Sequence, residues 1–238
     1  MKNIQLFKPL AALLLAFTIH PTLTKAQSSK NVALTNFNEV SVSSGIDVYL
    51  TQSNSENIRI SANEEVLKNV LIEKSGRGLV IRYKNSNGMN RLLKGQGTKI
   101  YINYKNMEVI NASGGSDVFT ENTLKSPRLT VHASGGADVK LDLAVKDLQL
   151  SISGGADAKL KGTATNMAVN SSGGSDVHAF DLITDYAKVS SSGGSDANVY
   201  VNKALEASAS GGSDITYKGD AALNKTSSSK SGDVRKAN

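Results

Sequence analysis

The chain contains no cysteine, no tryptophan, three histidines and three prolines among its 238 residues. Without cysteine it can form no disulfide, thiolate metal site, iron–sulfur cluster or cysteine nucleophile. Three histidines leave little for histidine-based catalysis or zinc binding. After residue 26 the only proline is Pro127, so the chain can form long uninterrupted strands. The apolar fraction of 39% is enough to bury a core, which excludes a wholly disordered chain.

The first 26 residues carry the features of an export signal in the expected order. Lys2 and Lys8 precede an apolar run from Leu10 to Ile19, and small residues at Thr24 and Ala26 match a signal-peptidase site. The apolar run is too short to span a bilayer, and no later segment is apolar enough to do so as a helix. We therefore expect cleavage after Ala26 and a protein of the periplasm, the outer surface or the extracellular space.

A six-fold motif, Ser-Gly-Gly-Ser/Ala-Asp, occupies the second half of the chain. Its aspartates lie 18 to 21 residues apart, and twelve of the 21 glycines belong to it. Shorter echoes occur at Ser44-Gly-Ile-Asp-Val48 and Ser231-Gly-Asp-Val234. The glycine is therefore positional and does not mark flexible linkers. The six aspartates are Asp117, Asp138, Asp157, Asp176, Asp196 and Asp214.

Around each motif, apolar or small residues alternate with polar ones, as from Leu129 to Leu143. A period of two predicts strands with one buried face. A repeat of about nineteen residues is too short for a helical hairpin or a propeller blade and fits one coil of a β-solenoid. We predict an all-β, right-handed parallel β-helix with 18 to 21 residues per coil. A buried column of small residues should mark the corner beside the motif: Ser116, Ala137, Ala156, Ser175, Ser195 and Ser213.

Four segments follow from these patterns. Residues 1–26 are the signal, and residues 27–105 form an irregular β portion that caps the sheet, with Asn63 as the cap of a helical turn. Residues 106–220 form the repetitive coils. Residues 221–238 are a degraded last coil or a disordered tail.

Several segments together resemble the head GIN domain family, whose label is "putative autotransporter adhesin". They are Phe37-Asn-Glu-Val40, Ser44-Gly-Ile-Asp-Val48, Asn57-Ile-Arg-Ile60, Glu65-Val-Leu-Lys-Asn69, Gly78-Leu-Val-Ile81, Lys99-Ile-Tyr-Ile-Asn103 and the motif ladder. The resemblance covers roughly residues 34 to 220. It implies a β-helical fold of mixed regularity in an exported Gram-negative protein, and it brings no catalytic residues. An autotransporter would need a C-terminal membrane barrel, which we do not expect within this chain.

The six motif aspartates fall on the polar parity, so they should point outward, one per coil. Neighbouring carboxylates about 4.8 Å apart repel by roughly 1 kcal/mol in water. Either backbone N–H groups and water offset this repulsion, or a row of Ca²⁺ ions bridges the coils. The six aspartates are thus candidate metal ligands, and we expect no other cofactor.

The first serine of each motif shares the outward parity: Ser113, Ser134, Ser153, Ser172, Ser192 and Ser210. A serine nucleophile would need a placed base, and neither His132 nor His178 recurs with the motif. We expect these hydroxyls to form a hydrogen-bonded ladder between coils and to have no catalytic role.

A basic stretch spans residues 73 to 105 and carries a net charge of +7. It is either a solvated face or a site for an anionic glycan or lipopolysaccharide phosphate. Nucleic acid is not expected, because the exported chain has few aromatic residues and shows no row of them. The candidate binding residues are Arg77, Arg82, Lys84, Arg91, Lys94 and Lys99.

The sequence therefore favours a non-catalytic, exported β-helix that presents a repetitive Ser/Gly/Asp face to a surface glycan or an envelope protein. One alternative is an enzyme acting on polysaccharide, for which Asp138, Asp157, Lys140 and Lys159 are the ladder-adjacent candidates. Another is a purely structural envelope protein. An exposed end coil could also pair with a second copy to form a homodimer.

Overall fold

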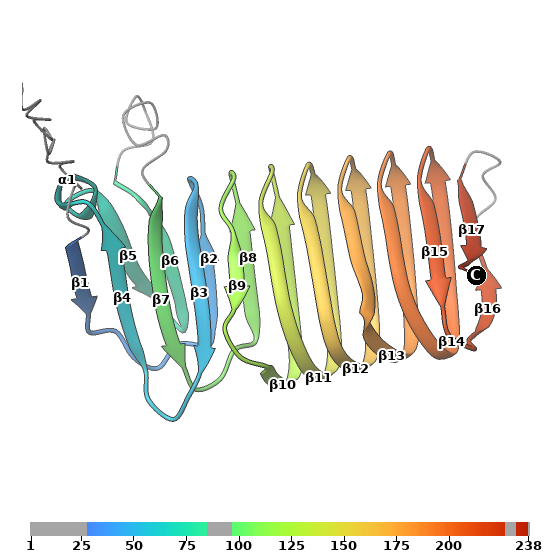
Figure 1. The fold of residues 1–238 in the computed structure, drawn as a ribbon, viewed down its shortest axis with the longest axis horizontal. Coiled ribbons are helices and arrows are strands. Elements are labelled where there is room, and N and C mark those ends of the chain that lie inside the picture. The colour runs from blue at the N-terminus through green and yellow to red at the C-terminus, as the bar shows by residue number, and fades with distance from the viewer. Residues whose placement is uncertain (1–27, 85–96, 227–231, 238) are drawn as a thin grey trace, which may run out of the picture.

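The computed structural model describes residues 28–84, 97–226 and 232–237. These residues form a long, flattened solenoid in which strands stack side by side along one axis (Figure 1). The N-terminal elements are β1 (Ser28–Val32), β2 (Glu39–Val42), β3 (Ile46–Gln52), β4 (Asn57–Ala62), α1 (Glu64–Leu67), β5 (Val70–Ser75), β6 (Gly78–Tyr83), β7 (Thr98–Tyr104), β8 (Val109–Ser113) and β9 (Val118–Thr120). The remaining strands are β10 (Leu124–Ser134), β11 (Asp138–Gly154), β12 (Asp157–Gly173), β13 (Asp176–Gly193), β14 (Asp196–Gly211), β15 (Asp214–Lys218), β16 (Ala222–Lys225) and β17 (Asp233–Lys236).

The predicted stacking of residues one repeat apart is confirmed. β11 pairs with β12 in parallel, with Asp138 beside Asp157, and β12 pairs with β13 with Asp157 beside Asp176. The register continues to Asp196 and Asp214. It extends to Asp233 of the second motif echo, because β17 pairs with β15. From β10 to β15, successive coils therefore stack on one another in the order in which they follow along the sequence.

Each coil has two walls joined by a corner and a bend. The segment after each motif forms the aspartate wall, which comprises residues 138–143, 157–161, 176–181, 196–200 and 214–218 together with β9, β3 and β7. The segment leading into the next motif forms the serine wall, which comprises residues 129–134, 148–153, 167–172, 187–192 and 205–210 together with β8, β2 and β6. The two walls bury their alternate side chains against each other in one core.

Glycine is needed at the corner because the first glycine of each pair has a positive φ and lies against the glycine of the preceding coil. Gly193 has φ +77°, and a Cβ built on it would lie 3.1 Å from the backbone nitrogen of Gly173. The predicted column of small residues lines the inside of this corner, and all six are fully buried. Small side chains and glycine together let the walls approach at this edge.

The N-terminal strands join the same sheet, but not in the order of the sequence. The rung made by β2 and β3 lies between the rung of β6 and β7 and the rung of β8 and β9. β4 then pairs antiparallel with β7, and β1 pairs antiparallel with β4 at the end of the sheet. The expected helical turn is present as α1, and the Asn63 side chain accepts a hydrogen bond from the Val66 amide.

Candidate functional site

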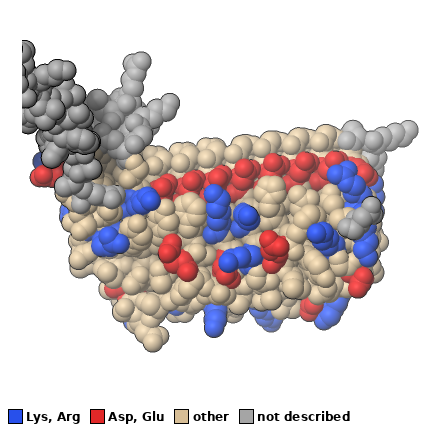
Figure 2. All heavy atoms as spheres, in the orientation of Figure 1, with Lys and Arg blue, Asp and Glu red and all other residues tan. Residues whose placement is uncertain are grey.

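A single row of carboxylates runs along the upper edge of the aspartate wall. The six motif aspartates are joined by Asp47 at one end, since Val48 is in register with Val118, and by Asp233 at the other. Figure 2 shows the row as a continuous line of acidic side chains along the solenoid. At the strand spacing of about 4.8 Å, every rung from β3 to β17 contributes one carboxylate.

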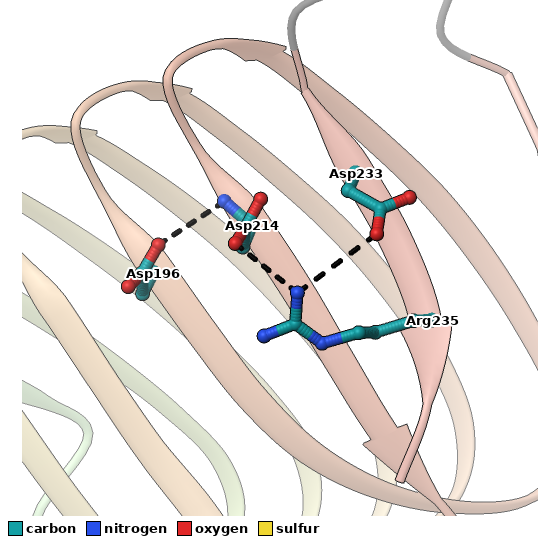
Figure 3. A network of polar contacts seen from close by, with 4 residues as sticks. All are labelled: Asp196, Asp214, Asp233 and Arg235. Atoms are coloured by element: carbon teal, nitrogen blue, oxygen red, sulfur yellow. Dashed lines mark hydrogen bonds and ion pairs between the residues drawn. The ribbon is translucent and has the colours of Figure 1, made fainter.

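Backbone N–H groups of the next coil offset part of the repulsion within this row. The Asp138 amide donates to Asp117 Oδ1 at 3.2 Å, and the Asp214 amide donates to Asp196 Oδ1 at 3.1 Å. At the C-terminal end, Arg235 Nη1 lies 3.3 Å from Asp214 Oδ2 and 3.9 Å from Asp233 Oδ2 (Figure 3). The carboxylates of Asp117, Asp176 and Asp196 thus each accept a backbone hydrogen bond from the next rung.

The middle of the row carries uncompensated charge. Lys140 Nζ lies 3.8 Å from Asp138 Oδ2, but within the described part of the chain no lysine or arginine lies within 4.0 Å of Asp157, Asp176 or Asp196. The described residues also contain no group of three or more metal-capable side chains placed to hold one ion. Cation binding along the row therefore stays a prediction, tested by comparing the melting temperature in Ca²⁺ and in chelator.

Asp47 lies at the N-terminal end of the row, and its carboxyl has a raised pKa. Burial raises the pKa of Asp47, the charge of Asp117 raises it further, and Lys99 opposes both. This site belongs to the rung of β3, where the row meets the irregular N-terminal strands.

The expected hydroxyl ladder of the first motif serines is present only in part: Ser113 Oγ donates to Val42 O at 3.4 Å, and Ser192 Oγ donates to Ser171 O at 3.5 Å. Most of the side-chain bonds between coils come from buried serines one residue before the aspartate: Ser175 Oγ donates to Ile152 O, Ser195 Oγ to Ser171 Oγ, and Ser213 Oγ to Ser191 O. Five of the six first serines line a shallow hollow on the serine wall: Ser134, Ser153, Ser172, Ser192 and Ser210. His132 also lies on the serine wall, whereas His178 lies on the aspartate wall, so the two histidines do not share a site.

An aromatic row exists where the sequence suggested none. The rings of Tyr101, Tyr49 and Phe119 stack on consecutive rungs with centroids 5.1 and 5.0 Å apart. Arg59 lies 4.2 Å from the Tyr101 centroid and Lys140 Nζ 5.3 Å from the Phe119 centroid, so a cation covers each outer face of the stack. With its ring faces covered, the row stabilises neighbouring rungs and does not form an open platform for a sugar.

The candidate basic residues that the structure describes lie on different walls of the solenoid. Lys99 lies on the aspartate wall, with its ammonium 5.6 Å from the Tyr49 ring centroid. Arg82 extends the serine wall on β6 and pairs with Glu73 at 3.3 Å. Arg77 lies in the turn between β5 and β6, and Lys84 follows β6. Arg91 and Lys94 lie outside the described residues.

The aromatic row could have been found in the sequence by extending the repeat to its first echo. Aligning Asp47 with Asp117 and Asp138 places Tyr49, Phe119 and Lys140 at the same position, two residues after the aspartate. Tyr101 carries no such signal, because β7 follows no copy of the motif.

A match to a family model shows which protein family the chain belongs to. The model described as "Putative auto-transporter adhesin, head GIN domain" matches residues 36–221. The chain belongs to the head GIN domain family. No curated protein matches it.

Solved structures show the same fold at low sequence identity. The chain is similar to a protein described as a putative adhesin from Bacteroides fragilis, with a TM-score of 0.81, 23% identity, and coverage of 90% of this chain and 98% of that one. It also resembles a protein described as a putative lipid binding protein from Parabacteroides distasonis, with a TM-score of 0.70, 20% identity and the same coverage. The solenoid fold is thus shared with proteins of divergent sequence.

The predicted signal, residues 1–26, lies outside the described residues. Among the described helices, none is long and apolar enough to cross a membrane.

Proposed function

We propose that this head GIN domain protein is an exported, non-catalytic adhesin-like module whose acidic edge contacts a positively charged component of the cell envelope or of the extracellular surface. The proposal rests on one observation: three consecutive carboxylates, Asp157, Asp176 and Asp196, are held in register with no basic side chain within 4.0 Å in the described chain. A partner that brings positive charge to this edge, directly or through Ca²⁺, would relieve repulsion that the fold itself leaves in place.

The names given to the family and to the similar structures support a binding role of this kind. Regular spacing also fits adhesion, because a rigid row of equal charges can make many weak contacts at once. Such multivalent contact gains affinity without a deep pocket.

The test is the binding of the mature chain, residues 27–238, to envelope preparations and to glycan arrays. A triple variant, Asp157→Asn with Asp176→Asn and Asp196→Asn, keeps the side-chain oxygen that accepts the backbone hydrogen bonds and removes the charge. We expect it to lose about tenfold or more in apparent affinity and most of the salt dependence of binding. The matched control changes the other wall: Ser153→Ala with Ser172→Ala and Ser192→Ala.

Equal loss in the aspartate and serine variants would contradict a role for the acidic edge. Binding of no envelope material by the native chain would favour the structural alternative. Steady release of unsaturated product from pectin-like or glycosaminoglycan polymers, lost on Lys140→Ala or Lys159→Ala, would favour the polysaccharide-acting enzyme instead.

A further inference from the structure

A hollow of about 730 Å³ lies where the bend of the coils meets the serine wall. It crosses the strands from β10 to β14. One row of its lining residues runs Arg128, Asp147, Asn166 and Tyr186 on consecutive rungs. Lys188 and Glu206 line it from the next row. The acidic edge lies on the other wall, so this hollow is a separate feature of the solenoid.

Tyr186 is exposed because it lies at the outward-facing bend of its coil, in the same row as Asp147 and Asn166. At this bend two outward positions follow each other before the buried alternation resumes, as at Asp185 and Tyr186 before Ala187. The side chain of Tyr186 is 46% exposed there. The outward position recurs in the coils from β10 to β14, and within them β13 is the strand that places an aromatic ring at it.

The ring of Tyr186 differs from the aromatic row on the other wall. Its neighbours in the row are Asn166 and Ala204, so no second ring is stacked on it in the described structure. Lys203 Nζ lies 5.4 Å from its centroid. That ammonium is itself held by Asp185, 2.9 Å away. Tyr186 therefore lines the hollow with no ring stacked on it in the described structure, whereas both faces of the Tyr49 ring are covered by neighbouring rings.

Four of the polar side chains around the hollow form two pairs, and the formal charges of the lining sum to zero. Asn166 Nδ2 donates to Asp147 Oδ1 at 2.7 Å, and Lys188 Nζ lies 2.7 Å from Glu206 Oε1. Arg128 and Lys188 thus balance Asp147 and Glu206. The pairs still leave carboxylate and amide oxygens as acceptors and ammonium and guanidinium N–H groups as donors. A charged ligand gains little from such a site, whereas a ligand with many hydroxyl groups can use both donors and acceptors.

We propose that this hollow binds neutral sugar rings of a glycan, with the C–H face of one ring against Tyr186 and hydroxyl groups hydrogen-bonded to the Asp147–Asn166 and Lys188–Glu206 pairs. Aromatic rings carry negative charge on their faces and attract the weakly positive C–H groups of a pyranose. The volume lies within the usual range of ligand sites, roughly 300 to 1,000 Å³. The site goes beyond the acidic contact proposed above and does not depend on it.

The experiment measures binding of the mature chain to neutral manno-, gluco- and galacto-oligosaccharides and to acidic oligogalacturonides by calorimetry or NMR titration. We expect a neutral oligosaccharide to bind, and Tyr186→Ala to weaken it by about tenfold or more. Tyr186→Phe keeps the ring and should stay within about threefold of the native chain. The matched control is Ile183→Ala, because Ile183 is 48% exposed on the same strand but does not line the hollow.

Three outcomes overturn the assignment: no neutral oligosaccharide binds at millimolar concentration, acidic oligosaccharides bind more tightly, or Tyr186→Ala and Ile183→Ala lose equally. The aspartate triple variant separates the two proposals, because it should lose envelope binding and keep sugar binding. Melting curves of each variant check folding, and Tyr186 and Ile183 are both exposed enough to be replaced without opening the core.

Discussion

The N-terminal rungs, built from β2 to β9, and the regular coils, built from β10 to β15, reach the same wall-to-wall geometry by different means. The N-terminal rungs bury large aliphatic side chains such as Ile46, Leu50 and Ile81, and they stack aromatic rings outside. The regular coils bury alanine and serine beside the corner, as at Ala156 and Ser195. Aliphatic side chains fill the core of both regions. The regions differ at the corner, where the regular coils combine small side chains with glycine, and on the outside, where the N-terminal rungs stack aromatic rings.

This difference explains why the strand order can depart from the sequence in the N-terminal rungs, whereas the regular coils follow a strict repeat. A strand order that departs from the sequence needs specific long-range contacts, and large side chains supply them. A strict repeat needs only that each coil can lie on the last one, which glycine permits at the corner.

The largest effect should come from blocking a corner of the regular coils. Gly193→Ala places a Cβ on a residue with φ +77° and 3.1 Å from backbone atoms of Gly173. The left-handed conformation and the backbone contact together should lower the free energy of unfolding by about 2–3 kcal/mol. Chemical denaturation of the mature chain measures this loss.

The adjacent glycine is the matched control. Gly194 does not have a positive φ, and its nearest contact, the oxygen of Gly173, lies at an ordinary 3.6 Å. Gly194→Ala should leave stability unchanged or raise it by up to about 1 kcal/mol. Similar losses for both glycines would refute the view that conformation at the first position sets the corner.

The next largest loss of stability is expected in the row two residues after each aspartate, which holds aromatic residues in the N-terminal rungs and lysine in β11 and β12 of the regular coils. Tyr49 stacks between two rings in the N-terminal rungs, and Lys159 occupies the same row in the regular coils. Tyr49→Ala should cost about 2 kcal/mol through lost stacking and burial. Lys159→Ala should stay within about 0.5 kcal/mol. The urea midpoints of the two variants test this, and a Lys159 loss as large as that of Tyr49 would contradict the contrast.

The regular coils could be predicted from the sequence because each residue pairs with one about a single repeat away. Period-two alternation gave the buried face, and the motif spacing gave the register, including Asp138 beside Asp157. The N-terminal order could not be predicted in this way. Its pairings join residues at unequal separations, such as Val40 with Leu79 and Ser41 with Asn111, and no constant spacing marks them in the sequence.

The Tyr186 hollow was missed for a different physical reason. Alternation marks a side chain as outward but does not say how far a bend protrudes. At the bend two outward positions follow each other, so the alternation breaks between the walls, and the motif spacing does not show which residue of a coil lies there.

A smaller difference in stability is expected between alanine variants of the buried corner serines in the two regions. Ser116 Oγ accepts hydrogen bonds from the Gly45 and Ile46 amides, 3.0 and 3.1 Å away, and so ties the first motif to the rung of β2 and β3. Ser116→Ala should cost about 1–2 kcal/mol, because it leaves two backbone donors without their acceptor. Ser195→Ala should cost less, since Ser171 Oγ keeps its bond to Ser191 Oγ and alanine already fills this position at Ala156. Thermal melts of the two alanine variants compare them, and a larger loss at Ser195 would reverse the order.

The smallest effect is a pH-dependent one at the boundary between the regions. Burial, reinforced by the Asp117 charge, raises the pKa of Asp47 above its ordinary 3.8, so ionisation of Asp47 costs the native state. That cost is complete above the raised pKa and disappears as the pH falls below 3.8, where the unfolded chain also takes up the proton. Asp47→Asn should therefore stabilise the protein slightly at pH 7, by less than about 1 kcal/mol because the carboxyl is half-exposed, and should have no effect near about pH 3. Lys99→Met removes the cation that opposes the raised pKa of Asp47, so it should destabilise the protein at pH 7. Melting curves of both variants at the two pH values test this. A lower melting temperature for Asp47→Asn at pH 7, or a higher one for Lys99→Met, would contradict the prediction.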